Sequence, residues 1–270
     1  MSNFDSTNGE GAVKKMDLKL QRQVETVQGN GVWRPQSSRK EVAPTQVALL
    51  LCDMWDKHWC QSATRRCDAI AHRLAQVVHQ LRQAGVTILH APSDCMEFYK
   101  EHPARQRMLQ VPHVEPPAAK EIADPPLPID DSDGGCDDQP QCHDYHAWTH
   151  QHPAISIHNE DGISDNGAEV YSLLQRRAIK TLLIAGVHTN MCVLHRTFAI
   201  KQMTRWGVDC VLIRDMTDTM YNPRMAPFVS HEEGTTRVIS HIERYWCPTT
   251  SSQDLLAPAQ PAVREIRREV

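Results

Sequence analysis

The order of hydrophobic and polar positions switches between two periods along the chain. Short, continuously apolar runs are typical of strands buried on both faces, and they predict strands at residues 46–53, 86–90, 154–158, 180–186 and 208–214. Apolar positions at helical spacing predict helices at residues 63–84, 167–177, 190–206 and 231–245. This alternation predicts a doubly wound, three-layer α/β/α fold, Rossmann-like, with about six mostly parallel strands.

The pattern lapses in three segments, which set the expected domain boundaries. Residues 1–43 are polar and have no sustained period, so we expect a poorly ordered tail, and we expect a second tail at residues 248–270. Residues 92–153 form a proline-rich stretch far longer than an ordinary connection. We interpret this stretch as an insertion over the carboxyl edge of the sheet, within a single domain at residues 44–247.

Composition narrows the class of ligand. The 270 residues carry a net charge of −4 and are 40% hydrophobic, which fits a globular chain with a sizeable core. Basic residues are scattered and no apolar run is long enough to cross a bilayer, so we expect a small-molecule ligand and neither a nucleic acid nor a membrane. The start of the chain lacks the apolar core of a secretory signal, and the nine cysteines are odd in number. Both features favour a reducing, cytoplasmic location.

Two side chains that could take part in catalysis follow predicted strands. Asp53 closes the first strand, and Cys192 lies in the first turn of the predicted helix at 190–206. The positive end of a helix lowers the pKa of a thiol, so Cys192 is a candidate nucleophile. The alternative, still open at this point, is a buried and unreactive thiol of the kind expected at Cys52, Cys67 and Cys210.

The segments around these two residues, LLLCDMWDKHWC and LLIAGVHTNMCVLHRTFAIKQMTRWGVDCVLIRDMTD, resemble the isochorismatase-like hydrolases, also called the cysteine hydrolase family. The resemblance covers about residues 46–245 and rests on an Asp that closes the first strand and on a Gly-Val-x-Thr-x-x-Cys-Val turn. The matching positions after that Asp are Gly186, Val187, Thr189, Cys192, Val193, Thr197, Ala199, Gly207 and Asp215.

The resemblance implies a Cys, Asp, Lys triad that hydrolyses an amide or a related C–N bond. Cys192 would form an acyl-enzyme and Asp53 would serve as the base. The amides of His188 and Cys192 would hold the oxyanion, across a Val187–His188 peptide bond that is cis in the family. We therefore expect an enzyme that acts on a small amide, carbamoyl or ureido compound and, again by resemblance, a homo-oligomer.

The lysine of this triad is missing. In the family it lies near the end of the third strand, but this chain has no lysine between Lys120 and Lys180. His158 stands near the expected position, and Lys100 offers a cation from another backbone position. Either would complete the triad. A third possibility is a degraded site, in which case the protein binds ligands or acts as a scaffold.

We expect Trp55, His58, His90, Asn190 and Tyr221 to line the substrate pocket. A rival function, a metal-dependent hydrolase, would use Asp53, His58 and His90 as ligands. Because Asp56 and His58 come too soon after Asp53 to match the metal-binding pair of family nicotinamidases, no metal and no cofactor are expected. The insertion also contains a small cluster of Cys and His whose spacing matches no standard zinc motif, although it leaves zinc open: Cys136, Cys142, His143, His146, His150 and His152.

Overall fold

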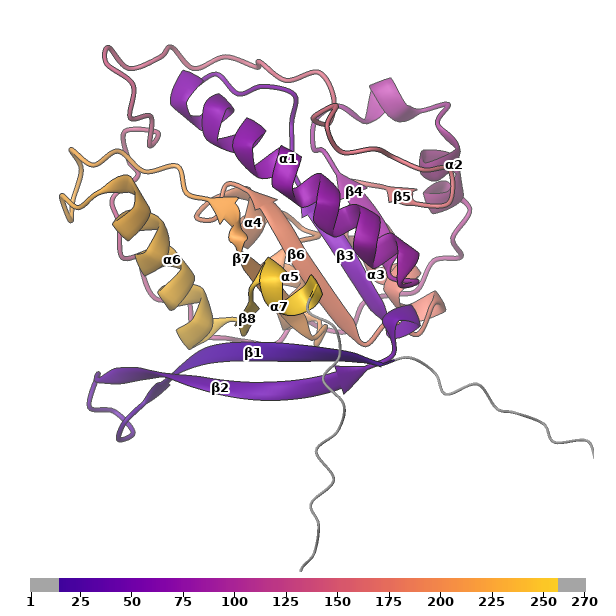
Figure 1. The fold of residues 1–270 in the computed structure, drawn as a ribbon, viewed down its shortest axis with the longest axis horizontal. Coiled ribbons are helices and arrows are strands. Elements are labelled where there is room, and N and C mark those ends of the chain that lie inside the picture. Colours follow the sequence, from indigo (N-terminus) through magenta and orange to yellow (C-terminus); the bar gives the residue numbers. More distant parts are fainter. Residues whose placement is uncertain (1–14, 257–270) are drawn as a thin grey trace, which may run out of the picture.

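A computed structural model describes residues 15–256 of the chain. One eight-stranded sheet forms its centre (Figure 1), with the strand order β2-β1-β8-β7-β6-β3-β4-β5. The strands are β1 (Met16–Glu25), β2 (Trp33–Val42), β3 (Val47–Cys52), β4 (Thr87–Ala91), β5 (Gly162–Ile163), β6 (Thr181–Val187), β7 (Cys210–Asp218) and β8 (Thr249–Thr250). Strands β3 to β8 pair in parallel, whereas β1 pairs antiparallel with both β8 and β2.

Helices cover both faces of this sheet, which confirms the predicted three-layer α/β/α class. On one face lie α1 (Gln61–Gln83) and α7 (Ser252–Leu256). On the other lie α3 (Gly167–Arg176), α4 (Cys192–His195), α5 (Ile200–Arg205) and α6 (His231–Tyr245). The helix α2 (Pro103–Leu109) packs beside β5 and α3, and two short 3-10 turns are η1 (Pro44–Gln46) and η2 (Met96–Tyr99).

Strand β3 shows why continuous apolar runs predicted the sheet. Every residue of Val-Ala-Leu-Leu-Leu-Cys is buried, because successive side chains point to opposite faces and both faces are covered. Leu50 packs with the layer formed by α3 to α6, while Leu49 and Leu51 pack with α1. At the α1 side, Ile70, Leu74 and their neighbours at helical spacing complete the core.

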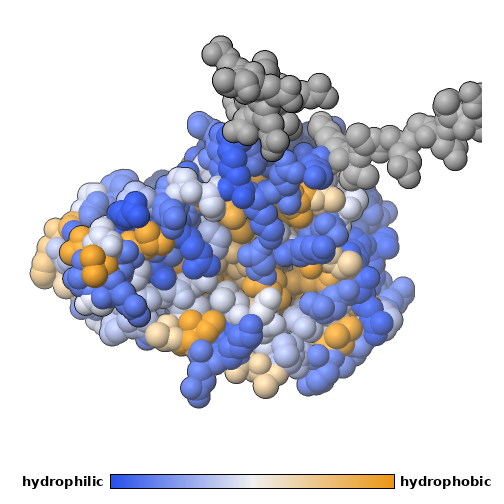
Figure 2. All heavy atoms as spheres, turned by 90° about the horizontal axis from the view of Figure 1, so that it is seen from below, coloured by the Kyte–Doolittle hydropathy of each residue, from blue (hydrophilic) through white to orange (hydrophobic). Residues whose placement is uncertain are grey.

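The prediction of a poorly ordered tail at residues 1–43 is wrong from Lys15 onward. Strands β1 and β2 form a ten-pair antiparallel hairpin that extends the sheet beyond β8, so the sheet has eight strands rather than six. Strand β1 meets the protein on both faces, through Leu18 on one face and through Gln21 and Gln23, which donate to Glu243 of α6, on the other, whereas β2 is almost entirely exposed. A mostly solvated, charged hairpin carries too little apolar periodicity to be recognised. Seen from the hairpin side, the surface is mainly hydrophilic with apolar residues in separate small patches (Figure 2).

Three further boundaries differ from the prediction. Part of the expected C-terminal tail, residues 248–256, is ordered as β8 and α7, and the rest lies outside the described residues. The expected strand at 154–158 is a turn that buries Ile155, and the short β5 pairs with β4 instead. The expected helix at 190–206 is broken into α4 and α5.

The break between α4 and α5 has a packing cause. The chain leaves α4 at Arg196, whose ψ of 149° is extended. Gly167 of α3 then packs directly on the next residue, since a Cβ at this position would lie 2.2 Å from the carbonyl oxygen of Thr197. The break between α4 and α5 therefore lies directly under a close contact with α3.

Among residues 15–256, no helix is both long enough and apolar enough to cross a membrane.

Candidate active site

The sheet brings the ends of β3 and β6 together. The two strands are direct neighbours, with Cys52 opposite Gly186. Gly186 has a φ of +123°, and a Cβ there would lie 1.9 Å from the carbonyl oxygen of Cys52, so only glycine allows this close approach. Asp53 follows β3 and Cys192 follows β6, and the two side chains therefore meet at the carboxyl edge, where sites form in open α/β sheets.

Asp53 is a buried carboxylate with three partners. One oxygen accepts a hydrogen bond from the Ser93 amide at 2.7 Å, and the other accepts one from Nε of Arg196 at 3.1 Å. Its remaining partner is the thiol of Cys192. Burial raises the pKa of Asp53, while Arg196 and then the hydrogen bonds from Cys192 and Ser93 oppose this rise.

Arg196 supplies the positive charge of the site. Its Nε contacts Asp53, and a terminal nitrogen contacts the carboxylate of Asp94 at 3.0 Å. Although partial burial works against its charge, Asp53 and then Cys192 raise the pKa of Arg196. Arg196 comes four residues after Cys192, at the end of the single turn of α4. The sequence analysis missed Arg196, although an i, i+4 spacing, which places two side chains on one helix face, is a signal that could have identified it.

Neither candidate for the missing lysine completes the site. His158 is half-exposed and contacts Glu160, 3.3 Å from its Nδ1. Lys100 is exposed and pairs with Glu97. Within residues 15–256, neither side chain makes a hydrogen bond or an ion pair with Asp53. Both side chains are largely exposed, and the cation that contacts Asp53 is Arg196 instead.

The thiol of Cys192 is half-buried and protonated at rest. Burial raises its pKa to about 12, with further contributions from the charge of Asp53 and their shared hydrogen bond. The charge of Arg196 and the backbone of His188 act in the opposite direction. The expected activation by a long helix is not available, because α4 has four residues. Attack by this sulfur therefore requires a base, and Asp53 lies next to it.

The turn that precedes Cys192 is buried and contains a cis peptide bond between Val187 and His188. Burial lowers the pKa of the His188 ring to about 3, so the ring is neutral. Neither ring nitrogen has a hydrogen-bond partner among the described residues. The ring meets that of His58 edge-on, with centroids 4.9 Å apart.

Two of the expected pocket residues lie next to Cys192. Trp55 belongs to an apolar cluster against which Cys192 packs, and its ring stacks on Trp148 with centroids 4.0 Å apart. Asn190 lines the hollow in front of the sulfur and donates to Asp131 at 2.6 Å. Cys192 therefore has both aromatic and polar side chains among its neighbours.

His90 and Tyr221 have structural roles instead. Both ring nitrogens of the buried His90 are occupied, by Gln151 at 2.8 Å and Asp161 at 3.0 Å. The hydroxyl of Tyr221 donates to the carbonyl of Met225 at 2.8 Å. A metal centre formed by Asp53, His58 and His90 is therefore not assembled, since His90 has no free nitrogen to offer.

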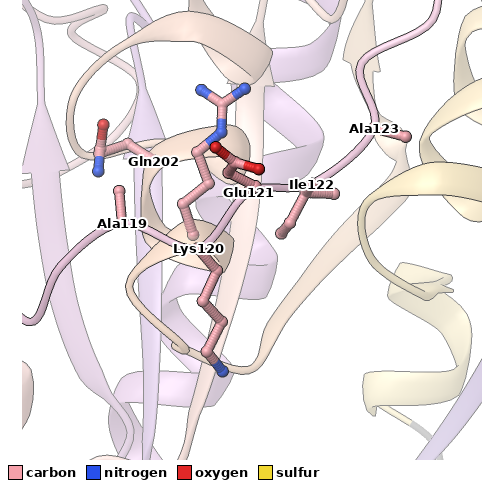
Figure 3. Close-up of a pocket in the computed structure, with 7 residues that line it drawn as sticks. Ala119, Lys120, Glu121, Ile122, Ala123 and Gln202 are labelled. Atoms are coloured by element: carbon pink, nitrogen blue, oxygen red, sulfur yellow. The ribbon is translucent and has the colours of Figure 1, made fainter.

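Cys192 opens into a hollow of about 580 Å³. Its wall combines two apolar side chains with charged and polar ones: Leu127, Met191, Asp131, Asn190, His195 and Arg196. A second hollow of about 620 Å³ lies between residues 119–123 and α5 (Figure 3). That hollow is lined by no cysteine, whereas the first contains Cys192 beside Arg196.

Comparisons with known proteins give matches only among solved structures. No family model and no curated protein matches the chain. A cysteine hydrolase from Pseudomonas syringae pv. phaseolicola 1448A is similar at 15% identity and a TM-score of 0.49, over 79% of this chain and 92% of that one. An isochorismatase from Pseudomonas putida KT2440 has 11% identity and a TM-score of 0.48, over 79% and 91%. An isochorismatase family protein from Burkholderia thailandensis has 13% identity and a TM-score of 0.43, over 78% and 94%.

Proposed function

We propose that the chain is a cysteine-dependent hydrolase that cleaves a C–N bond of a small amide, carbamoyl or ureido compound. One observation carries the proposal: Cys192, Asp53 and Arg196 converge at the carboxyl edge of the sheet, with Arg196 3.1 Å from the Asp53 carboxylate and with Asp53 and Cys192 close enough that each shifts the pKa of the other. A nucleophile beside a base that is itself held by a third group is the arrangement of covalent catalysis.

In the first half-reaction, Asp53 accepts the proton of the Cys192 thiol as the sulfur attacks the substrate carbonyl carbon. The carbonyl oxygen takes up the electron pair of the broken π bond, and the amides of His188 and Cys192 stabilise it. Donors of this kind are typically worth about 3 to 4 kcal/mol in the transition state. Collapse of the tetrahedral intermediate breaks the C–N bond, and protonated Asp53 returns its proton to the leaving nitrogen.

In the second half-reaction, Asp53 takes a proton from water as the oxygen attacks the thioester. The C–S bond breaks, the acid product leaves and the thiol regains its proton. Arg196 is a positioning residue in both steps, because its charge keeps Asp53 ionised in a buried position. The hollow beside Cys192 has a cation, a carboxylate and amide groups in its wall, which suits a small polar substrate.

The test is a panel of small amides, carbamoyl and ureido compounds assayed for release of amine or ammonia. Wild-type protein is expected to turn over at least one compound and to show an acyl adduct at Cys192 by intact mass. Cys192→Ala abolishes both, whereas Cys210→Ala, which removes a buried thiol in β7, leaves turnover unchanged.

Labelling by iodoacetamide gives a second readout. Half-buried Cys192 is expected to react faster than the fully buried Cys210. If no compound is turned over and Cys192 labels no faster than Cys210, the hydrolase function is wrong, and ligand binding without turnover becomes the better account of the site.

A further inference from the structure

Three cysteines from two distant parts of the chain surround one carboxylate oxygen. Cys60 lies at the start of α1, whereas Cys136 and Cys142 belong to the insertion. Their sulfur atoms lie 3.4, 3.7 and 3.3 Å from Oδ2 of Asp138, respectively. The ligand atoms of Cys60, Cys136 and Asp138 all lie within 4.8 Å of one another, a group that does not include Cys142, whose sulfur contacts Asp138 but would move inward on a metal ion.

The three sulfur-to-oxygen separations match the corresponding edges of a tetrahedral metal site. With zinc-to-sulfur bonds of about 2.3 Å and a zinc-to-oxygen bond of about 2.0 Å, tetrahedral angles place sulfur and oxygen about 3.5 Å apart. The three sulfur-to-oxygen distances at Asp138 scatter around this value. A hydrogen-bonded cluster of thiols would not need three sulfurs to share one oxygen.

The groups around the cluster hold the proposed ligands in place. The amide of Ser62 donates to Oδ2 of Asp138 at 2.9 Å, and its hydroxyl donates to Oδ1 at 2.5 Å. The amide of Ala63 donates to the sulfur of Cys60 at 3.4 Å. Both amides belong to the first turn of the 23-residue helix α1, whose positive end favours anionic thiolates. Such outer partners orient metal ligands and tune their basicity.

A second contact ties the same loop to the body of the protein. Arg66 of α1 donates to Asp137 at 2.9 Å and to Asp218 of β7 at 2.9 Å. The loop that carries Cys136 and Asp138 is therefore already positioned on α1 by residues outside the ligand set. Preorganisation of this kind lowers the entropy that metal binding must overcome.

We propose that Cys60, Cys136, Cys142 and Asp138 form a structural zinc site. Three thiolates and a carboxylate satisfy all four positions of a tetrahedral zinc ion and leave none for a substrate, which is the mark of a structural rather than a catalytic site. Thiolate sulfur also selects zinc over magnesium or calcium. The sequence left zinc open at Cys136 and Cys142, but it missed Cys60, which is 76 residues from Cys136 and is brought to it only by the fold.

The site has a consequence for the hollow at Cys192. Met191, the residue before Cys192, packs against the apolar side of the cluster, and Asp131 in the same insertion lines the hollow. Zinc would anchor the insertion to α1 and so fix one wall of the hollow. The zinc site stands independently of the hydrolase function, because its test reads metal binding rather than turnover.

The experiment measures zinc in the full-length protein purified under reducing conditions. The expected result is one zinc per chain by elemental analysis. Replacement with cobalt should give a sulfur-to-cobalt charge-transfer band and the visible spectrum of a tetrahedral complex. Cys60→Ser should weaken zinc binding by at least the 10- to 100-fold typical of losing an outer partner. Serine keeps a side chain able to cap α1, so this variant removes the sulfur without removing the cap.

Cys67→Ser is the matched control, since Cys67 lies on the same helix outside the cluster and should leave zinc binding unchanged. Asp138→Cys gives a four-thiolate set and should tighten zinc binding in competition with a chromophoric chelator. Zinc binding by Cys60→Ser equal to wild type would overturn the proposal. So would a wild-type protein that takes up no zinc while two of the three cysteines form a disulfide.

Discussion

Asp53 combines complete burial with a charge that the proposed reaction needs. Its pKa is raised by burial, so the ionised form is the less stable one in the folded protein. A carboxyl group with a raised pKa favours folding most at low pH, and that contribution is lost as pH rises through its folded pKa. At neutral pH the site therefore keeps a base at some cost in stability.

The substitution Asp53→Asn separates the role of Asp53 as a base from its effect on stability. The amide oxygen can still accept from the Ser93 amide, but the side chain can no longer take a proton. We expect turnover to fall by about 10²- to 10⁴-fold. The free energy of unfolding at neutral pH should stay within about 1 kcal/mol of wild type or rise, because a buried charge is removed. Turnover assays and urea unfolding measure the two quantities, and a large parallel loss of stability would contradict the argument.

Arg196→Gln tests the cation at Asp53. Removing a neighbouring positive charge raises the pKa of a carboxyl, and Asp53 must be ionised to accept the thiol proton. The acid limb of the profile of kcat/KM against pH should therefore move to higher pH by about one unit. Arg196→Lys keeps the charge and should move the limb less.

Asp94→Asn is the control for this shift. Asp94 contacts the outer nitrogen of Arg196 and not Asp53, so its loss should leave the acid limb nearly in place. An acid limb that is unmoved in Arg196→Gln as well would show that Asp53 does not depend on this cation.

At the scale of elements, a buried network joins α1, β4 and the segment that precedes β5. Asp161 accepts from Arg82 at 2.7 Å and contacts His90 at 3.0 Å, and it also accepts from the His158 amide at 2.8 Å. Burial alone would raise the pKa of Asp161, but hydrogen bonds from His90 and then Arg82 hold it well below its usual value. The stability that this carboxylate contributes is present above its unfolded pKa and is lost as pH falls through the folded pKa.

Asp161→Ala leaves Arg82 and His90 without their shared partner. Breaking a buried ion pair in this way typically costs about 3 to 5 kcal/mol. Urea unfolding at neutral pH should show a loss of this size, and the variant should lose less stability than wild type on acidification. Glu160→Ala, which removes the exposed neighbour, should change the free energy of unfolding by less than about 0.5 kcal/mol.

A substitution at Gly186 tests how closely strands β3 and β6 must approach each other. In Gly186→Ala the new Cβ would lie 1.9 Å from the carbonyl oxygen of Cys52, so the strand ends that carry Asp53 and Cys192 must separate. We expect a loss of more than about 2 kcal/mol together with loss of turnover. Gly29→Ala has a positive φ as well but no atom within 4 Å, and it should cost only about 1 kcal/mol.

At the scale of the whole molecule, the sequence correctly predicts those parts of the fold whose hydrophobic pattern matches their burial in the structure. Strand β3 is buried on both faces, so its apolar run was sufficient, and the positions of Asp53 and Cys192 follow from the order of strands. The hairpin of β1 and β2 escaped prediction because a solvated edge leaves little hydrophobic signal. Arg196 and the cluster at Cys60 escaped because their partners come from other elements, and only the folded sheet brings these together.

The hairpin is held to the rest of the molecule by a buried carboxylate. Glu243 of α6 is 1% exposed and accepts from Gln21 and Gln23 of β1, each at 2.9 Å, and from Thr249 of β8 at 2.6 Å. The direct pairing of β1 with β8 is limited to Gln21 and Thr249, so these side-chain bonds supply much of the polar connection.

Glu243→Ala should therefore loosen the hairpin before it unfolds the protein. The two glutamines can turn to solvent, but the buried hydroxyl of Thr249 loses its acceptor, at a cost of about 1 to 3 kcal/mol. Limited proteolysis in the turn between β1 and β2 should become faster by more than the loss of global stability, measured by urea unfolding, would account for. Glu233→Ala removes an exposed carboxylate from the same helix and should leave both measurements near wild type. Equal proteolysis in the two variants would mean that the apolar contacts of Leu18, rather than Glu243, hold the hairpin in place.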